Sequence, residues 1–197
     1  MKHPRPFAEW IVGLIILGFV AAILSPPRSG GARRNARRSS CQSNLKQIML
    51  ACQQYQQDFD QTLPPLSGRE NEGWVQLLFP YARDWHLFQC PEGYRPETAE
   101  STDYFYNARF AGAAKIKVPS QVILMGEGLD NSSSNTHLLE LPLEWKTNER
   151  SPAQRHFVGA NYAFTDGHVR WLRPTLIEGR DGVTVYSFVV PPRKLKK

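Results

Sequence analysis

The chain opens with an apolar run, Phe7–Leu24, in which Glu9 is the only charged residue. A helix needs about 20 apolar residues to cross a bilayer, with a lower limit near 17. Pro26 and Pro27 follow the run and would end such a helix. We therefore expect residues 1–27 to form a minimal N-terminal transmembrane anchor.

A cleaved secretory signal is the alternative for the same segment, because Lys2 and Arg5 supply a basic start. We favour a retained anchor, since the residues before Pro26 offer no clean small-x-small cleavage site.

A second helix is indicated by apolar positions spaced four and three apart. These positions are Cys41, Leu45, Ile48, Cys52, Tyr55 and Phe59. Such a stripe with polar residues opposite it predicts a helix that packs on a sheet. Ser39 or Ser40 would cap its start, with Ala36–Arg38 as an alternative earlier turn, and Leu63-Pro64-Pro65 would end it. Residues 28–38 then become a basic linker, and residues 39–192 the folded domain.

Ser120–Glu127, which follows Pro119, reads as a buried strand. Residues 126–135 are rich in Gly, Asp, Asn and Ser and predict a loop. Glu127, Asp130 and Asn131 are weak candidates for a calcium site. They lack the regular alternation of a calcium-binding loop, so we favour a plain loop and expect no cofactor.

Asp166-Gly167 predicts a hairpin with a two-residue turn, because both residues tolerate positive φ. That turn pairs Phe164 with Val169 and Tyr162 with Trp171, which places these four side chains on one face.

A last strand is expected over Val183–Val190, paired with the strand that carries Trp171 or with a sheet edge.

The three cysteines are Cys41, Cys52 and Cys90. Cys41 and Cys52 would lie about 16 Å apart along one helix, so they cannot bridge each other. A disulfide must therefore use Cys90, and Cys41–Cys90 is the pairing that we prefer. Three free buried thiols are the alternative. No C-x-x-C pair indicates a zinc site.

The net charge of +6 lies at the ends of the folded domain. The basic residues there outnumber the net charge, which leaves the middle of the chain slightly acidic; they are Arg28, Arg33, Arg34, Arg37, Arg38, Arg193, Lys194, Lys196 and Lys197. Residues 193–197 form a basic tail. Basic ends beside an apolar segment favour anionic lipid over nucleic acid as the partner. We therefore do not expect the chain to bind nucleic acid.

Short motifs along the chain occur in the order of a known family. They are Cys41-x-x-Asn44-Leu45-Lys46-Gln47-Ile48, Leu63-Pro64-Pro65, Cys90-Pro91, Tyr104–Asn107, Arg155-His156, Gly159-Ala160-Asn161, Ala163-Phe164, Asp166-Gly167-His168-Val169 and Trp171-Leu172. The spacing from His156 to Asp166-Gly167 resembles the H-x9-D-G signature of prepilin-like, pseudopilin-like proteins of the type II secretion G type, which are abundant in planctomycetes.

The resemblance implies an α+β, type IV pilin-like fold, in which the N-terminal transmembrane helix and an amphipathic helix pack on an antiparallel sheet. Glu9 aligns with the family's glutamate, which implies a subunit or membrane contact. Pro4 stands where the family has the glycine before the peptidase cut, which argues against prepilin processing and N-methylation.

The first functional hypothesis is a non-enzymatic pilin-like subunit of a type II secretion or surface-fibre system. It would be a single-pass protein of a bacterial inner membrane, with a periplasmic domain and with other pilin-like subunits or secretion machinery as partners. The five arginines after the anchor instead favour a cytoplasmic domain by the positive-inside rule. The sequence leaves this conflict open.

Two other functional classes are compatible with parts of the sequence. An anchored extracytoplasmic binding module for carbohydrate or protein would use aromatic side chains, namely Trp74, Trp85, Tyr94, Tyr104 and Tyr106. A hydrolase would use His156, Asp166 and His168 as acid–base groups. We disfavour the hydrolase, because the sequence contains no recognisable nucleophile motif.

Overall fold

The computed structural model describes residues 6–24, 30–68, 70, 72–93, 100–114, 116, 119–177 and 186–189. Contacts divide the chain into two units, residues 1–33 and 34–197, which are described separately. The first unit contains helix α1 (Pro6–Leu24), whose side chains are described from Trp10 to Ile23. Its large apolar side chains are exposed, Trp10 by 74% and Ile23 by 70%.

Over the part of the chain that the structure describes, no helix combines the length and the apolar character needed to cross a membrane.

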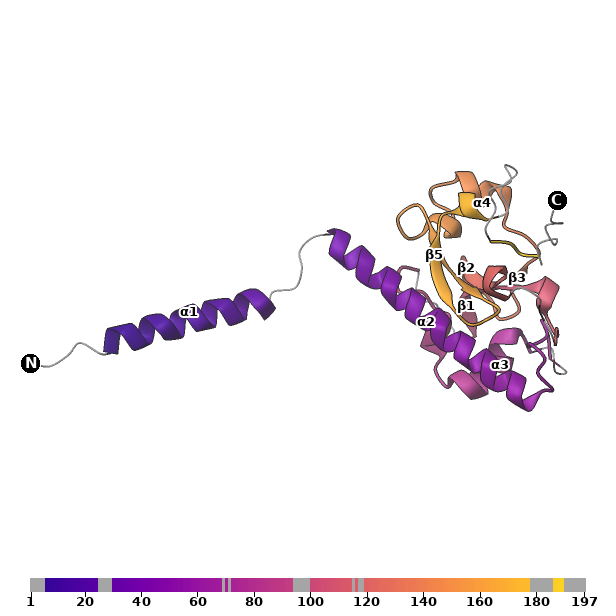
Figure 1. The fold of residues 1–197 in the computed structure, drawn as a ribbon, viewed down its shortest axis with the longest axis horizontal. Coiled ribbons are helices and arrows are strands. Elements are labelled where there is room, and N and C mark those ends of the chain that lie inside the picture. The colour runs from indigo at the N-terminus through magenta and orange to yellow at the C-terminus, as the bar shows by residue number, and fades with distance from the viewer. Residues whose placement is uncertain are drawn as a thin grey trace, which may run out of the picture. The chain divides into compact units, whose positions relative to one another are not determined.

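Helix α2 (Gly30–Asp58) carries the predicted stripe and dominates one side of the second unit (Figure 1). Cys41, Leu45, Ile48 and Cys52 are fully buried, and Met49 and Ala51 widen the stripe. Phe59 lies beyond the helix, 48% exposed and stacked on Tyr55.

The predicted start of this helix at Ser39 or Ser40 was wrong, because α2 begins at Gly30 and includes most of the expected linker. Ser40 is accommodated inside the helix, where its hydroxyl donates to the carbonyl of Ala36 one turn earlier.

Within the described residues, five strands form one sheet in the order β3-β1-β2-β4-β5. They are β1 (Ser101–Asn107), β2 (Ile123–Ser133), β3 (His137–Leu138), β4 (Ala160–Phe164) and β5 (Val169–Leu172). All neighbouring pairs are antiparallel except β1 and β3, which are parallel. The α+β class is therefore confirmed, whereas the sheet is mixed rather than wholly antiparallel.

Both faces of the sheet are covered, which is why β1 and β4 are buried along their whole length. On one face, α2 and helix α3 (Trp74–Ala82) enclose a core that includes Trp74, Tyr106 and Leu124. On the other face, helix α4 (Leu143–Thr147) and the C-terminal segment enclose a second core, which is built around aromatic side chains.

The predicted loop at residues 126–135 was wrong, because β2 continues to Ser133. Its pairing with β1 contains a wide irregularity: Thr102 lies opposite Ser132, but Tyr104 lies opposite Glu127. Asp103 alone thus faces residues 128–131. Its carboxylate compensates for the interrupted ladder by accepting a 2.9 Å hydrogen bond from the backbone N–H of Asn131.

Asp166-Gly167 does reverse the chain, but the loop has three residues and the predicted register was wrong. Ala163 pairs with Val169, and the Phe164 N–H donates to the His168 carbonyl. Of the three loop residues, all described, Gly167 alone has a positive φ, of 87°. A type I turn followed by a left-handed glycine therefore replaces the primed turn, which needs two positive φ values.

The corrected register divides the four side chains that were expected to share a face. Tyr162 and Phe164 enter the second core. Val169 packs against the first core, beneath α2.

The last predicted strand falls partly outside the described residues. Its described part forms two isolated parallel bridges, Tyr186 to Ile177 and Ser187 to Val122. Neither bridge involves the strand that carries Trp171.

Gly126→Ala tests the tight packing of β2 on the aromatic core. A Cβ there would lie 2.6 Å from the Tyr162 ring and 2.8 Å from the Phe105 ring. We expect a loss of about 2–3 kcal/mol of unfolding free energy, typical of overpacking, measured by urea denaturation.

Gly112→Ala is the matched control, because Gly112 has a φ of +72° and no atom within 4 Å of the added Cβ. Left-handed strain alone should cost about 1 kcal/mol. A Gly126→Ala variant as stable as wild type would contradict the packing described here.

Candidate functional site

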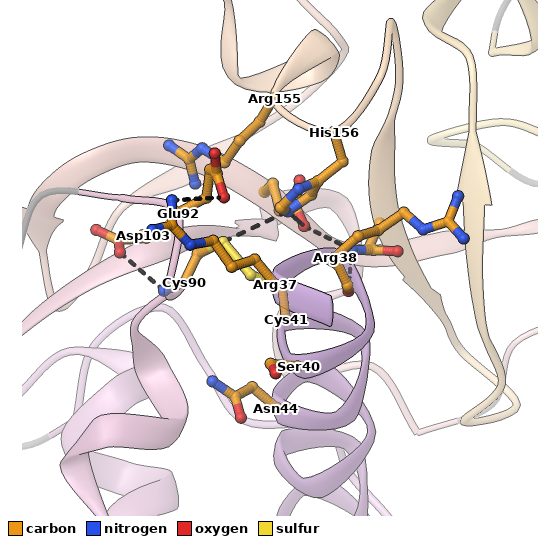
Figure 2. The surroundings of a disulfide bond; sticks show 12 residues. Arg37, Arg38, Ser40, Cys41, Asn44, Cys90, Glu92, Asp103, Arg155 and His156 are labelled. Atoms are coloured by element: carbon orange, nitrogen blue, oxygen red, sulfur yellow. Dashed lines mark hydrogen bonds and ion pairs between the residues drawn. A yellow bond between two sulfur atoms is a disulfide. The ribbon is translucent and has the colours of Figure 1, made fainter. Parts of the chain in front are cut away.

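A disulfide joins α2 to the segment that follows Phe88, as predicted. Cys41 and Cys90 are bonded, with their Cα atoms 5.1 Å apart (Figure 2). The segment around Cys90 is fixed from two directions. Asp103 accepts a 2.8 Å hydrogen bond from the Cys90 N–H, and Asn44 of α2 donates to the Gln89 carbonyl at 2.9 Å. The disulfide and these two hydrogen bonds together fix the position of Cys90.

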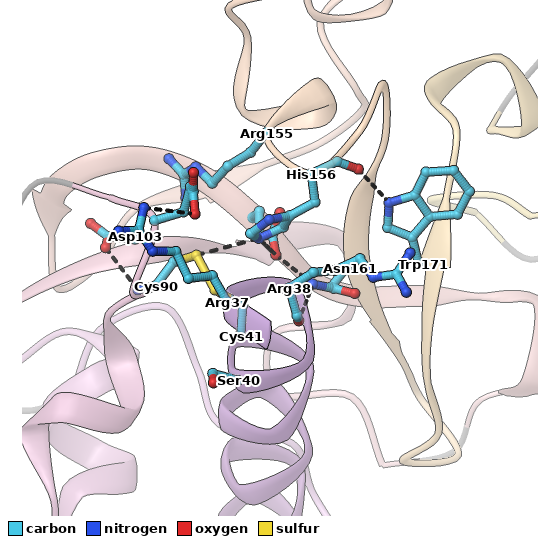
Figure 3. Close-up of polar contacts among 12 residues, drawn as sticks. Arg37, Arg38, Ser40, Cys41, Cys90, Asp103, Arg155, His156, Asn161 and Trp171 are labelled. Atoms are coloured by element: carbon cyan, nitrogen blue, oxygen red, sulfur yellow. Dashed lines mark hydrogen bonds and ion pairs between the residues drawn. A yellow bond between two sulfur atoms is a disulfide. The ribbon is translucent and has the colours of Figure 1, made fainter. Parts of the chain in front are cut away.

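A buried ionisable pair lies against the disulfide. His156 Nε2 is 3.0 Å from Glu127 Oε1 and 3.5 Å from Cys90 Sγ. The side chains are 2% and 0% exposed. Asn161 Nδ2 donates to the same Glu127 oxygen at 2.8 Å and to the Arg38 carbonyl at 3.2 Å (Figure 3). We name the set Cys41, Cys90, Glu127, His156 and Asn161 the buried polar cluster.

Two hydrogen bonds hold the backbone of His156 in place. The His156 N–H donates to the Gly159 carbonyl at 2.8 Å, and the His156 carbonyl accepts a 2.7 Å hydrogen bond from Trp171 Nε1. The guanidinium of Arg38 lies over the Trp171 ring, with the Arg38 Cζ atom 5.8 Å from the centre of that ring. The histidine is thereby fixed between the base of the hairpin and the first turns of α2.

The buried polar cluster is not fully satisfied. Glu127 Oε2 and Asn161 Oδ1 are buried without a hydrogen-bond partner among the described residues, as are the hydroxyls of Tyr104 and Tyr162. A buried carboxylate oxygen without a donor is costly, and such atoms mark sites of function or of an additional ligand. Burial, together with the negative charge of Glu127, raises the pKa of Tyr104 and of Tyr162.

A second charged group adjoins the cluster. Arg155 Nη2 donates to the Gly128 carbonyl at 2.9 Å and pairs with Asp130. Burial raises the pKa of Asp103, although the N–H groups of Asn131 and Cys90 favour its charged form. These contacts stabilise the irregular part of β2.

The residues predicted as a signature occupy two separate places. His156 precedes β4, whereas Asp166 and Gly167 follow it. The five residues of β4 alone span about 17 Å, so the histidine and the aspartate do not form an acid–base pair.

At the far end, Asp166 Oδ1 lies 2.6 Å from His168 Nδ1. Gly167 offers its carbonyl to Lys46 of α2 at 2.7 Å. Glu9 is in α1, and its side chain lies outside the described residues.

The three calcium candidates have separate partners. Glu127 belongs to the buried polar cluster, Asp130 pairs with Arg155, and Asn131 uses its backbone N–H on Asp103.

Aromatic residues considered for a ligand surface mostly serve the core. Trp74, Tyr104 and Tyr106 are 0% exposed. Trp85 is half-buried and stacks on Phe79, while Tyr94 lies outside the described residues.

The partners of His156 were not identified from the sequence. Glu127 was predicted as the end of a buried strand and as a weak calcium candidate, and Asn161 as part of a family motif, but neither as a partner of His156. One usable signal lies in β4, which is buried along its whole length, because a buried amide such as that of Asn161 needs a hydrogen-bond partner.

The profile of one protein family, described as "Protein of unknown function (DUF1559)", matches residues 31–89. The matched segment holds most of α2 and all of α3, and it does not include His156 or the hairpin. No curated protein and no solved structure matches the chain. The match is compatible with a pilin-like surface protein, but the family description names no function.

Replacing one partner of the His156–Glu127 pair should be strongly destabilising. Removing one member of a buried pair typically costs about 3–5 kcal/mol, because the other is left uncompensated. We expect His156→Gln and Glu127→Gln each to show losses of this size in urea denaturation.

The double variant supplies the control for this pair. It should lose clearly less stability than the two single losses added together, since no uncompensated charge remains. Strictly additive losses would show that the two side chains do not interact.

Cys52 should be inert in the folded chain. It is fully buried, is not part of the disulfide, and burial raises the pKa of its thiol, which disfavours the reactive thiolate. A thiol-reactive chromogenic disulfide should label no cysteine of the native oxidised chain and Cys52 alone after denaturation. Rapid labelling without denaturant would contradict this burial.

Proposed function

We propose that the chain is a pilin-like structural subunit, anchored in a bacterial membrane by its N-terminal helix and carrying its α+β unit outside the cytoplasm. The carrying observation is the apolar surface of α1. Leu14, Ile15 and Leu17 are 66%, 64% and 65% exposed. Apolar surface of this extent needs lipid or the helices of other subunits.

The proposed span is the sequence run Phe7–Leu24. It extends beyond the described side chains at both ends and reaches the minimum length for a bilayer.

The arrangement of the second unit supports the same proposal. A long helix whose apolar stripe packs across a mainly antiparallel sheet is what the resemblance to prepilin-like proteins implies. The second unit contains two hydrophobic cores and the buried polar cluster, as expected of a rigid subunit.

The disulfide supports an extracytoplasmic location, because disulfides persist in oxidising compartments and are rare in the cytosol. It opposes the positive-inside argument from the arginines. Three of those arginines also contact the protein itself: Arg34 lies over Phe157, Arg37 pairs with Glu92, and Arg38 lies over Trp171.

Glu9 would meet a basic group of a neighbouring subunit or of the membrane surface, since a carboxylate next to lipid needs a partner. Other pilin-like subunits or secretion machinery are the proposed partners, and no catalytic activity is proposed.

Charged substitutions in α1 test the anchor. Each lysine at the centre of a spanning helix costs about 2.5–3.5 kcal/mol of insertion free energy. We expect Leu14→Lys combined with Leu17→Lys to move the full chain out of carbonate-washed bacterial membranes, measured by immunoblotting of pellet and supernatant.

The matched control is Leu129→Lys combined with Leu139→Lys, two leucines of the second unit that are 58% and 54% exposed. This variant should stay with the membrane like wild type. A wild-type chain found wholly in the supernatant would overturn the proposal.

A further inference from the structure

Four side chains of the buried polar cluster have the composition of a metal site. The sulfurs of Cys41 and Cys90, a carboxylate oxygen of Glu127 and a ring nitrogen of His156 all lie within 4.8 Å of one another, and all four residues are buried. The ligand atoms around one tetrahedral zinc ion are separated by about 3.3–3.8 Å. Small side-chain movements therefore suffice to reach that geometry.

We propose that this cluster binds a single Zn²⁺ ion when the Cys41–Cys90 disulfide is reduced. The disulfide and the metal site are then alternative states of the same four residues. This inference does not depend on the structural role proposed above.

The donor set suits zinc. Thiolate and imidazole ligands favour zinc over calcium or magnesium, which prefer oxygen ligands. His156 presents Nε2 toward both Glu127 and Cys90, so a single ring nitrogen is already directed at the site. Two thiolates, one carboxylate and a neutral imidazole give a complex of charge −1, and Arg155, which precedes His156 in the sequence and pairs with Asp130, adds a positive charge to the surroundings.

Supporting contacts of the kind found around metal ligands are also present. Asn161 holds Glu127, and Asp103 holds the backbone of Cys90. Glu127 Oε2 has no hydrogen-bond partner among the described residues, although its side chain is 0% exposed. A bound cation would satisfy this oxygen.

The ligands lie far apart in the sequence, so spacing within the chain could not indicate the site. They come from α2, from the segment after Phe88, from β2 and from the segment before β4. A cavity of about 380 Å³ reaches Cys90 and is lined also by Asn44 and Gln89. It offers a path for a reductant and for the ion.

The change of state balances with a dithiol as the reductant. One of its thiolates attacks a sulfur of the disulfide, and its second thiol then displaces the remaining cysteine. The reductant is oxidised to a disulfide while Cys41 and Cys90 gain two electrons and two protons. Both cysteine protons leave to solvent as the two zinc–sulfur bonds form.

Zinc titration of the purified full chain in detergent tests the proposal. The chain is reduced with a water-soluble phosphine, which yields the phosphine oxide and avoids chelation by dithiols, and is desalted without oxygen. Competition with a chromophoric chelator then measures zinc affinity, and native mass spectrometry measures stoichiometry. We expect one zinc ion per reduced chain and binding at least about 100-fold weaker to the oxidised chain, because a lost ligand costs more than an outer contact.

Matched variants assign the ligands. Cys90→Ser and His156→Gln should weaken binding at least about 100-fold, whereas Cys52→Ser and His168→Gln should bind like wild type. Cobalt in place of zinc should show the intense visible bands of a tetrahedral thiolate site, and Cys90→Ser should lose them.

Folding is followed by circular dichroism in every sample. A reduced chain that unfolds alone and refolds with zinc supports the proposal. A reduced wild-type chain that takes up no more zinc than the oxidised chain, folded or unfolded, overturns it. So does a Cys90→Ser variant with wild-type affinity.

Discussion

The packing of α2 across the sheet is the contact on which the rest of the second unit depends. Its stripe supplies one side of the first core, and each fully buried Leu or Ile contributes about 1.5–3 kcal/mol. The disulfide fixes the middle part of this helix to Cys90, and the side chains of Lys46 and Gln42 donate hydrogen bonds to backbone carbonyls of the hairpin. The helix is thereby held to the sheet by apolar, covalent and polar contacts along its length.

The buried polar cluster lies where α2, the Cys90 segment and the hairpin base meet. Burying a carboxylate there is costly, and His156 and Asn161 offset this cost for only one of its two oxygens. Stability alone would favour apolar residues of similar volume. The zinc-bound, reduced state proposed above gives these polar side chains a role beyond stability. The sulfurs of Cys41 and Cys90, which lie beside His156 and Glu127, would supply the two thiolate ligands of that state.

Local patterns accounted for the elements but not for their polar connections. The 4-3 spacing of α2, the apolar stretch of β2 and the Asp-Gly reversal are properties of adjacent residues, and helical geometry excluded a Cys41–Cys52 bridge. The earlier start of α2 was missed because Ser40 can satisfy its hydroxyl inside a helix as well as at a cap. The extension of β2 was missed because Asp103, from another strand, replaces the interrupted ladder contact.

The length of the hairpin loop shows how a single backbone detail determines the cluster. Asp-Gly fits a two-residue turn and the end of a three-residue loop equally well, so the sequence cannot distinguish them. A one-residue difference reverses the face of every β5 side chain relative to β4. In the observed register Trp171 pairs with Asn161, on the side of α2, where its indole N–H reaches the His156 carbonyl. With the shorter loop Trp171 would face the second core, and His156 would lose the contact that fixes its backbone beside Glu127.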